Sequence, residues 1–563
     1  LERYERREGL LLARGRIFGE RRERNIYLPA DLSNQHILCI GSSGSGKSRL
    51  IFHLSSQLIE DERRSLILMD PHGDLFQNLL RLIAQRAFGP EGRRDLAERV
   101  VLIEPANMKY GCPCLNILEH EEGRFDFEVV AELISAFRSI WSDSWGPRLE
   151  DILRNCCLAL QSMDLTLVEM PWLLMDGDFR RYVVSKLENE DVRMYFEKHF
   201  PGLSEKDQRY FIESSRNKVS AFISNPFLKP ILGAGRSTIR FAEIMNQGKI
   251  CLINLSRSRL KTEARRLFGS LLMAKILMGM LSREEVPEEK RVPTTILVDE
   301  AHEVFCRDLF LPLLEGGRKY KVQLGLFHQS LSQLDPEDVD IILGNTAVQI
   351  CFQVGRKDAE RISREFWSFT GRRVKLQQRD LWGPKGKPTF YSVQEEIENA
   401  ISELTNQGVR ECYIKLKGVS PDPYIATTFP VSYPEPNPEW EESLRRISAK
   451  RYNRGFKEIS REIEERRKSL QRAMEEQKRS SERKADKEES ALSSEEDLFL
   501  RDVHARPFVP LWQRYKDLGT RISKSKASRI KGKLVKLGYI AVSYTHLRAH
   551  ETRHDLVCRL LLE

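Results

Sequence analysis

The feature that most constrains the fold of this chain is a glycine-rich loop at residues 41–48. It reads Gly-Ser-Ser-Gly-Ser-Gly-Lys-Ser, which fits the pattern G-x-x-x-x-G-K-S/T of phosphate-binding loops. The apolar run His36–Ile40 precedes it as a candidate strand, and residues 49–54 follow it as a candidate helix. A strand, a loop and a helix in this order favour a nucleotide-binding loop over a flexible Gly/Ser turn before a surface helix.

The chemistry of such a loop follows from its residue types. Glycines let the backbone wrap closely around a triphosphate and direct successive N–H groups at its oxygen atoms. The helix that follows turns its positive end toward the same phosphates. Lys47 would neutralise the β- and γ-phosphate oxygens, and the Ser48 hydroxyl would be a ligand of Mg²⁺. The predicted nucleotide-binding residues are Gly41, Ser42, Ser43, Gly44, Ser45, Gly46, Lys47 and Ser48.

A second motif, far along the chain, supplies carboxylates. The apolar run at 294–298 ends in Asp299 and Glu300. Such a run is a weak signal alone, but with the loop upstream it becomes a strong one, because both strands must meet at one magnesium site. We predict that Asp299 holds Mg²⁺, through water, and that Glu300 is the general base for the attacking water.

Three polar residues are further candidates for the site. Gln329 ends the apolar run before it and could contact the γ-phosphate or the attacking water; the alternative is a helix-capping amide. Hydrolysis also needs positive charge on the γ-phosphoryl group, which a neighbouring subunit can supply. We predict Arg318 for this role, with Arg356 as reserve, although either could equally be a solvated or DNA-facing arginine.

The apolar runs also indicate how the chain is divided. Strand-like runs that alternate with helical patterns predict a parallel sheet covered on both faces, whereas residues 125–245 show helical periodicity throughout. The predicted segments are a β-structured lead-in at 1–35, the two parts of an ATPase core at 36–124 and 246–435, an all-α insertion at 125–245, a charged arm, helical or disordered, at 436–493, a winged-helix-like module at 494–542, and residues 543–563. The core ends in a proline-spaced stretch with Pro430, Pro434, Pro436 and Pro438.

The C-terminal part carries two separate signals. Residues 494–542 read as short helices ended by Gly519 and Gly538 and followed by an apolar run, the order of a winged helix-turn-helix that can place a helix in a DNA groove. A small protein–protein module with a basic face is an equal alternative. Residues 543–563 resemble a translated sequencing adaptor, and we expect no function there.

Composition sets wide limits. A chain of 563 residues exceeds one compact core, and 91 Lys+Arg against 82 Asp+Glu permit nucleic-acid binding without requiring it. The ten cysteines lack zinc spacing, which favours free thiols in a reducing cytosol. No apolar run reaches the roughly 18–20 residues of a membrane span. Because the chain begins with Leu1, we interpret it as a fragment, cytoplasmic, and at the inner face of the membrane if an upstream anchor was lost.

Together the motifs resemble the HerA/FtsK superfamily of hexameric DNA-pumping ATPases. The likeness covers roughly residues 9–435, and the motifs are the loop at 41–48, Asp-Pro-His-Gly-Asp-Leu at 70–75, Ser-Trp-Gly-Pro-Arg at 144–148, Val-Asp-Glu-Ala-His at 298–302, Gly-Arg-Lys-Tyr at 317–320 and Gln-Ser-Leu-Ser-Gln-Leu at 329–334. Within the superfamily, the conjugative coupling proteins of type IV secretion are the closest resemblance, since they too carry an all-α insertion. The resemblance implies a ring of six copies, ATP between subunits and DNA through the centre. It also implies that Asp70 and Asp74 lie near the nucleotide, although their spacing alone indicates an ordinary turn.

We therefore predict an α/β fold with a RecA-like P-loop NTPase core, an all-α insertion and a C-terminal winged-helix-like module. The predicted function is Mg²⁺-dependent ATP hydrolysis that drives DNA translocation, with DNA, further copies of the chain and a secretion or relaxase protein as partners. One alternative is a secretion-system ATPase that acts on proteins, whose hydrolysis would be indifferent to DNA. The other is a nucleotide-gated DNA-binding regulator, against which Glu300 argues because a switch needs no general base.

Overall fold

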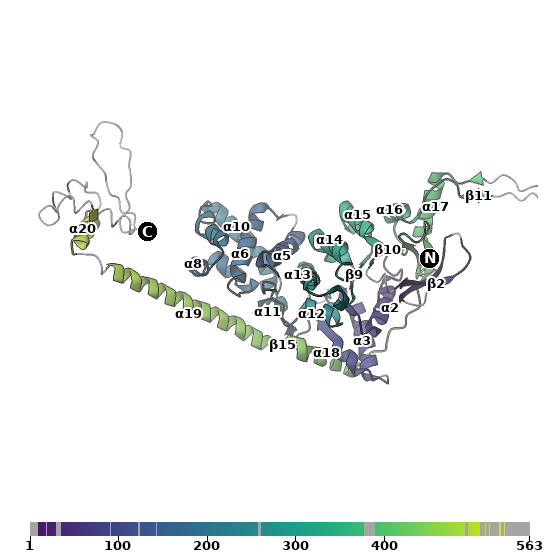
Figure 1. Cartoon of the computed structure of the whole chain (residues 1–563), viewed down its shortest axis with the longest axis horizontal. Coiled ribbons are helices and arrows are strands. Elements are labelled where there is room, and N and C mark those ends of the chain that lie inside the picture. The colour runs from purple at the N-terminus through teal and green to yellow at the C-terminus, as the bar shows by residue number, and fades with distance from the viewer. Residues whose placement is uncertain are drawn as a thin grey trace, which may run out of the picture. The chain divides into compact units, whose positions relative to one another are not determined.

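The computed structural model describes most of the chain. The described residues are 9–18, 20–29, 35–90, 92–121, 124–141, 144–256, 260–376, 389–489 and 494–506, with single positions at 513, 517, 529, 530 and 534. The chain divides into two compact units, residues 1–468 and residues 469–563 (Figure 1). The first unit holds every candidate site residue.

An 11-stranded sheet forms the centre of the first unit, in the order β2-β1-β14-β13-β10-β3-β9-β8-β4-β7-β5. The strands are β1 (Gly9–Ile17), β2 (Arg24–Pro29), β3 (His36–Ile40), β4 (Ser65–Asp70), β5 (Val100–Ile103), β7 (Ile250–Asn254), β8 (Thr294–Val298), β9 (Val322–His328), β10 (Thr346–Cys351), β13 (Glu411–Leu416) and β14 (Tyr424–Thr427). Neighbours from β10 to β5 are parallel, and the remaining pairs are antiparallel. The α/β class predicted from the sequence is confirmed.

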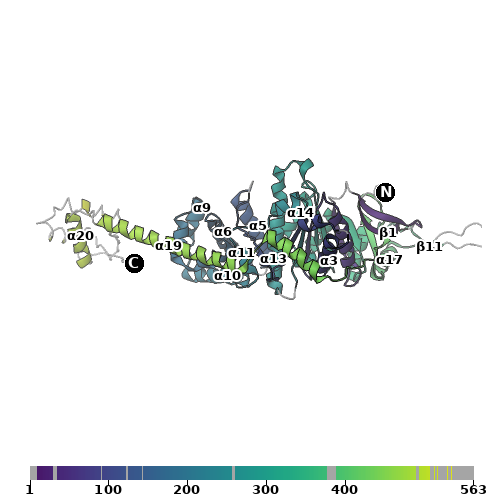
Figure 2. The same ribbon diagram turned by 90° about the horizontal axis from the view of Figure 1, so that it is seen from below.

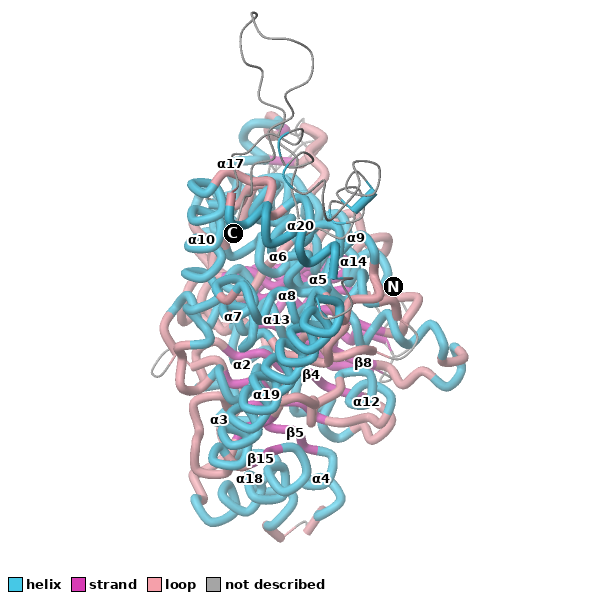
Figure 3. Tube along the Cα trace, turned by 90° about the vertical axis from the view of Figure 1, so that its left-hand side faces the viewer, coloured by secondary structure: helices cyan, strands magenta, loops and turns pink. Residues whose placement is uncertain are grey.

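The parallel strands are apolar runs because both of their faces are covered. Every residue of β3, β4, β8 and β9 is buried, as expected for a sheet between two helical layers. On one face pack α2 (Lys47–Glu60), α3 (Asp74–Phe88) and α4 (Arg94–Arg99), which share one apolar core with the strands. Helices α14 (Arg307–Gly316) and α15 (Pro336–Asn345) lie on the opposite face (Figure 1). Figure 3 shows β4 between α2 and α12.

The segment predicted as an all-α insertion is helical in the structure. Its helices are α5 (Asp126–Ile140), α6 (Pro147–Gln161), α7 (Met170–Met175), α8 (Gly177–Val184), α9 (Glu190–Met194), α10 (Glu205–Ile223), α11 (Leu228–Gly233) and α12 (Phe241–Asn246). They form a bundle beside the sheet (Figure 2). The bundle connects to α13 (Thr262–Leu281), because α5, α10 and α12 all contact that helix.

The segment predicted at 436–493 as a charged arm, helical or disordered, is mainly helical in the structure, and its first helix is docked on the core. Helix α18 (Pro438–Tyr452) packs on α3 and β5, with Leu444 fully buried, so this part joins the first unit. The Ser448 hydroxyl accepts a hydrogen bond from the Leu102 N–H at 2.9 Å. Helix α19 (Phe456–Glu489) follows, and Arg466 in it pairs with Glu169 at 3.0 Å. Sparse apolar positions on a charged helix are thus enough to dock it.

The second unit is described only in part. Helix α20 (Ser494–Ala505) is its one described helix besides the end of α19 and the single helical positions beyond Arg506. The predicted winged-helix-like module at 494–542 therefore lies mainly outside the described residues, and the adaptor-like stretch at 543–563 lies wholly outside them. In the described part of the chain, the helices are each too short or too polar to cross a bilayer.

Candidate nucleotide-binding site

The register of the parallel strands brings the predicted motifs to one edge of the sheet. Strand β3 pairs with β9 up to Ile40 opposite His328, and β9 pairs with β8 up to Leu326 opposite Val298. The residues that follow these strands are therefore neighbours at their carboxyl ends, where open parallel sheets bind ligands. This places the loop after β3, the acids after β8 and Gln329 after β9 around one point.

The phosphate-binding loop is held by hydrogen bonds to neighbouring strands. The Gly41 N–H donates to the His328 carbonyl at 3.2 Å, and the Ser42 N–H donates to the Gln353 carbonyl at 2.7 Å. Gly46 has φ 127°, a backbone conformation that side chains rarely adopt, and it leads directly into α2. The loop motif demands glycine at this position for that reason.

Lys47 begins α2 with its ammonium group turned back over the loop. The side chain is buried, and Nζ donates to the carbonyl oxygens of Gly41 and Ser42, the latter at 3.2 Å. The charge therefore stands where the phosphates of a nucleotide would lie. Backbone N–H groups at the start of α2 add to the positive potential at this point.

Three carboxylates converge opposite Lys47. Asp70 ends β4 and accepts hydrogen bonds from the N–H groups of His72 and Phe76, both at 2.8 Å. Burial raises the pKa of Asp299 to about 7, with smaller contributions from Asp70 and Glu300, while Lys47 acts in the opposite direction. Such crowded negative charge fits a divalent cation with oxygen ligands. Ser48 and Asp299 are the side chains that would hold Mg²⁺.

Glu300 is held in a strained and buried position. Its φ of 43° is in the left-handed region, which costs a non-glycine residue roughly 1–3 kcal/mol and is typical of functional sites. Its N–H donates to Asp299 Oδ1 at 3.0 Å, and Oε1 accepts a hydrogen bond from Gln329 Nε2 at 2.8 Å. His302 Nδ1 lies 3.6 Å from Oε2, the oxygen that has no hydrogen-bond partner among the described residues.

Gln329 was predicted either to contact the phosphate or water, or to cap a helix. In the structure its amide donates to the carboxylate of Glu300. The capping contact in this segment belongs to Ser330, whose hydroxyl accepts the N–H of Ser332 at 3.2 Å. Gln329 therefore positions Glu300.

These groups surround one pocket of about 440 Å³. Lys47, Ser48, Asp70, Asp299, Glu300 and Gln329 all line it. Asp74 lines it as well, in agreement with the place that the family resemblance implies for Asp70 and Asp74. The pocket also contains side chains that the motifs did not indicate, Val409 and Tyr433 among them. The proline-spaced stretch was the only signal in the sequence for Tyr433, and Val409 had none.

The two candidate arginines lie elsewhere. Arg318 is exposed in the turn between α14 and β9, at the amino end of that strand and thus at the opposite edge of the sheet from Gln329. Arg356 begins α16 (Arg356–Phe366) and pairs with Glu398 at 2.9 Å and with Glu360 at 3.2 Å. Arg318 could therefore reach a nucleotide only in another copy of the chain.

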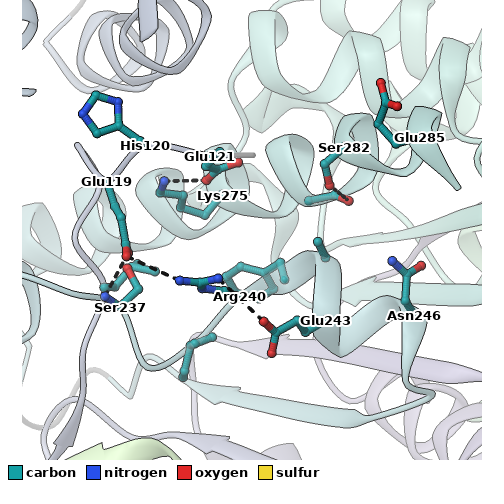
Figure 4. A pocket seen from close by; sticks show the side chains of 15 residues that line it. Glu119, His120, Glu121, Ser237, Arg240, Glu243, Asn246, Lys275, Ser282 and Glu285 are labelled. Atoms are coloured by element: carbon teal, nitrogen blue, oxygen red, sulfur yellow. Dashed lines mark hydrogen bonds and ion pairs between the residues drawn. The ribbon is translucent and has the colours of Figure 1, made fainter. Parts of the chain in front are cut away.

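A second cavity, of about 460 Å³, lies where the insertion meets the core (Figure 4). Lys275 of α13 donates to Glu121 at 2.6 Å. Arg240 lies 3.6 Å from Glu119 and 3.9 Å from Glu243. Lys275 and Arg240 are thus both paired with carboxylates, which makes this cavity a junction between the two regions whose lysine and arginine already have partners.

Comparison with known proteins agrees with this site. Residues 15–276 match the family model described as "Helicase HerA, central domain". Two crystal forms of the bacterial conjugative coupling protein TrwBdeltaN70 have a similar fold: the unbound monoclinic form is 15% identical, with a TM-score of 0.51 over 77% of this chain and 93% of that chain. The trigonal form with sulphate is 17% identical, with a TM-score of 0.50 over 77% and 91%.

VirB4 of Thermoanaerobacter pseudethanolicus is 13% identical, with a TM-score of 0.45 over 76% of this chain and 97% of that chain. No curated protein matches the chain. The family match, the phosphate-binding loop and the carboxylates at the same edge of the sheet lead to one conclusion. The chain is a P-loop ATPase that uses ATP and Mg²⁺ as its cofactors, and its residues 15–276 are similar to the HerA central domain.

Proposed function

We propose that this ATPase is a motor that binds and translocates DNA as a ring of six copies. The observation that carries the proposal is the position of Glu300, which Gln329 holds at the pocket that Lys47 and Asp299 also line. A positioned general base is what turnover requires. The HerA family match and the fold of a conjugative coupling protein favour DNA as the substrate.

The proposed hydrolysis follows from the contacts of the side chains. Lys47 and the N–H groups of the loop would neutralise the phosphates. Ser48 and Asp299 would hold Mg²⁺, which as a Lewis acid would stabilise the negative charge that develops on the ADP leaving group. Gln329 holds Oε1 of Glu300, so the buried Oε2 is left to take a proton from the attacking water. The water oxygen bonds to the γ-phosphorus as the bond to the bridging oxygen breaks.

The general base gives the sharpest test of turnover. Glu300→Gln keeps the shape and the hydrogen bond to Gln329 but cannot accept the proton, so ATP should bind and remain uncleaved. We expect kcat to fall about 10²- to 10⁴-fold, the usual contribution of a general base, with ATP affinity retained in an equilibrium titration. Unchanged turnover would contradict the mechanism. Normal regulation of DNA binding in this variant would favour the nucleotide-gated regulator.

The ring has its own test, because Arg318 lies at the edge of the sheet away from its own pocket. Arg318→Ala and Lys47→Ala should each be inactive alone, since one lacks the proposed trans arginine and the other the phosphate lysine. Mixed rings would contain some pockets with both residues, so mixing the two variants should restore part of the hydrolysis. Arg356→Ala is the control, because Arg356 pairs with Glu398 of its own chain. No recovery on mixing would refute a trans role for Arg318.

DNA as the substrate is tested by hydrolysis with and without DNA over a range of salt concentrations. Contacts to phosphates release counterions, so stimulation by DNA should fall steeply as salt rises. Good hydrolysis that DNA leaves unchanged would favour a secretion-system ATPase that acts on proteins. We further propose that the motor works in the cytoplasm, where a relaxase or another secretion protein brings it to its substrate.

A further inference from the structure

The nucleotide pocket has an apolar end that lies outside the loop and the acidic motif. Val409 and Tyr433 line this end, and they are 65% and 39% exposed. The same pocket is lined by the charged side chains of Lys47, Asp299 and Glu300. Large apolar side chains left open inside a pocket indicate contact with the apolar part of a ligand.

Tyr433 is carried by the strap, which we define as residues 428–437 between β14 and α18. The strap has no helix or strand, and its prolines fix the backbone in an extended form. Pro434 also disfavours a helical conformation at Tyr433. The Tyr433 ring packs edge-on against Phe52 of α2, with centroids 5.0 Å apart at 88°. Earlier in the strap, the Phe429 ring lies 5.4 Å from the ring of His53, the residue after Phe52 in α2.

Val409 is carried by a turn tied to both the phosphate loop and the strap. The N–H of Arg410 donates to the Ser45 carbonyl at 2.8 Å, and the Arg410 carbonyl accepts the N–H of Thr428 at 3.0 Å. Arg410 has φ 71°, so the turn keeps a strained backbone next to the loop. The turn and the strap therefore hold their side chains in fixed positions beside the phosphates.

The order of groups along α2 decides which part of a nucleotide meets this apolar end. Asp299 and Glu300 are expected next to the γ-phosphate. Lys47 and Ser48 are expected next to the phosphates closer to the sugar. Arg49 comes next, and the pKa of Tyr433 is raised by burial while the neighbouring Arg49 opposes that rise. The Tyr433 ring packs on Phe52, more than one helical turn after Lys47, so it lies beyond the residues that would bind the phosphates.

We propose that Tyr433 and Val409 bind the base of the nucleotide, with the phenol ring stacked on its face. This inference rests on the proposed ATP hydrolysis, and it adds the residues that bind the base of ATP. Every base has an aromatic face, so stacking of this kind strengthens the binding of ATP and GTP alike. The phosphates alone gain nothing from it.

The test compares two probes on the full chain. ATP carries a base, whereas inorganic tripolyphosphate offers the phosphates only. Tyr433→Ala should weaken ATP and GTP binding about tenfold or more, as expected for loss of one stacked base, and should leave tripolyphosphate binding unchanged. Tyr433→Phe keeps the ring and should bind ATP as the parent does. Tyr210→Ala, which removes an exposed tyrosine from α10, is the control and should change neither affinity.

Each other outcome has a definite meaning. Unchanged ATP affinity in Tyr433→Ala would overturn the inference. Equal loss for ATP and tripolyphosphate would also overturn it, because the ring would then act only by holding α2 and the loop in place. A parent chain that binds neither probe would refute the proposed ATPase function itself, which separates the failure of one proposal from that of the other.

Discussion

Two buried lysines in two cavities of similar volume show how differently this fold uses the same charge. Lys47 and Lys275 are both 6% exposed, in pockets of about 440 and 460 Å³. Lys47 donates to carbonyl oxygens of its own loop, while Lys275 donates to the carboxylate of Glu121. Cavity volume therefore does not distinguish the candidate nucleotide pocket from the junction, but the hydrogen-bond partner of the lysine does.

The partners of the two lysines indicate the role of each region. Burying a charge without a counter-charge costs free energy of folding. The protein tolerates it only if neighbouring polar or charged groups stabilise the charge. Around Lys47 that compensation comes from loop carbonyls and from the carboxylates across the pocket, an arrangement that polyphosphate and Mg²⁺ complete. Around Lys275 the compensation is already complete within the chain. One lysine is available to a ligand, and the other fastens the insertion to the core.

The largest expected effect is the loss of ATP hydrolysis when Lys47 is replaced. Lys47→Ala should abolish ATP hydrolysis, because the γ-phosphoryl group loses its main fixed positive charge as negative charge develops. Folding should change little, since the lost partners are exchangeable carbonyl contacts. Steady-state hydrolysis and a thermal melt on the same preparation would check both parts. Substantial residual hydrolysis would show that the two lysines differ less than their partners suggest.

The second effect is on folding rather than on catalysis. Lys275→Met should destabilise the first unit by about 3–5 kcal/mol, because it leaves Glu121 partly buried without its partner. The double variant with Glu121→Leu should recover much of the loss, since an apolar pair can replace a buried ion pair. Urea unfolding of the three proteins would measure this. Loss of ATP binding in the folded single variant would contradict a purely structural role.

Protonation of the same junction gives a third, smaller effect. Burial raises the pKa of Glu132 to about 7 although the ion pair with Arg124 opposes that rise, and Glu121 adds to it. Between pH 4.5 and 7 the folded chain thus holds a proton that the unfolded chain has lost, so stability should fall as pH rises, by up to about 1.4 kcal/mol per pH unit from this group. Glu132→Gln should flatten that slope in unfolding curves at pH 5, 6 and 7. An unchanged slope would assign the dependence to other groups.

The convergence of the loop, Asp299 and Glu300 at one edge of the sheet was predictable because these residues follow strand ends. The phosphate loop, Asp299 and Glu300 stand directly after apolar runs, and parallel strands bring their carboxyl ends together whatever lies between them. The contact between Gln329 and Glu300 was not predictable, because it depends on the left-handed backbone of one residue.

The apolar residues of the pocket were not predictable from the sequence pattern. Tyr433 lies in an extended strap whose sequence has neither helical nor strand periodicity. The spacing of its prolines was therefore the only sequence feature that distinguished this segment. The docking of α18 was missed for a related reason: Leu444 and a few neighbours bury a helix whose composition indicates an exposed arm. Both features depend on which surfaces meet in three dimensions.

The smallest expected effect on stability concerns the second ion pair at the junction, that of Arg240. Arg240 pairs with Glu119 and Glu243, but its side chain is 59% exposed, so water already solvates the charges. Arg240→Ala should therefore cost less than about 1 kcal/mol, and added salt should erase the difference, whereas the loss in Lys275→Met should persist in salt. Unfolding at low and high salt separates the two. If Arg240→Ala instead lowered the free energy of unfolding as much as Lys275→Met does, burial would not decide which ion pairs hold the insertion on the core. The exposed ion pair would then be as important as the buried one.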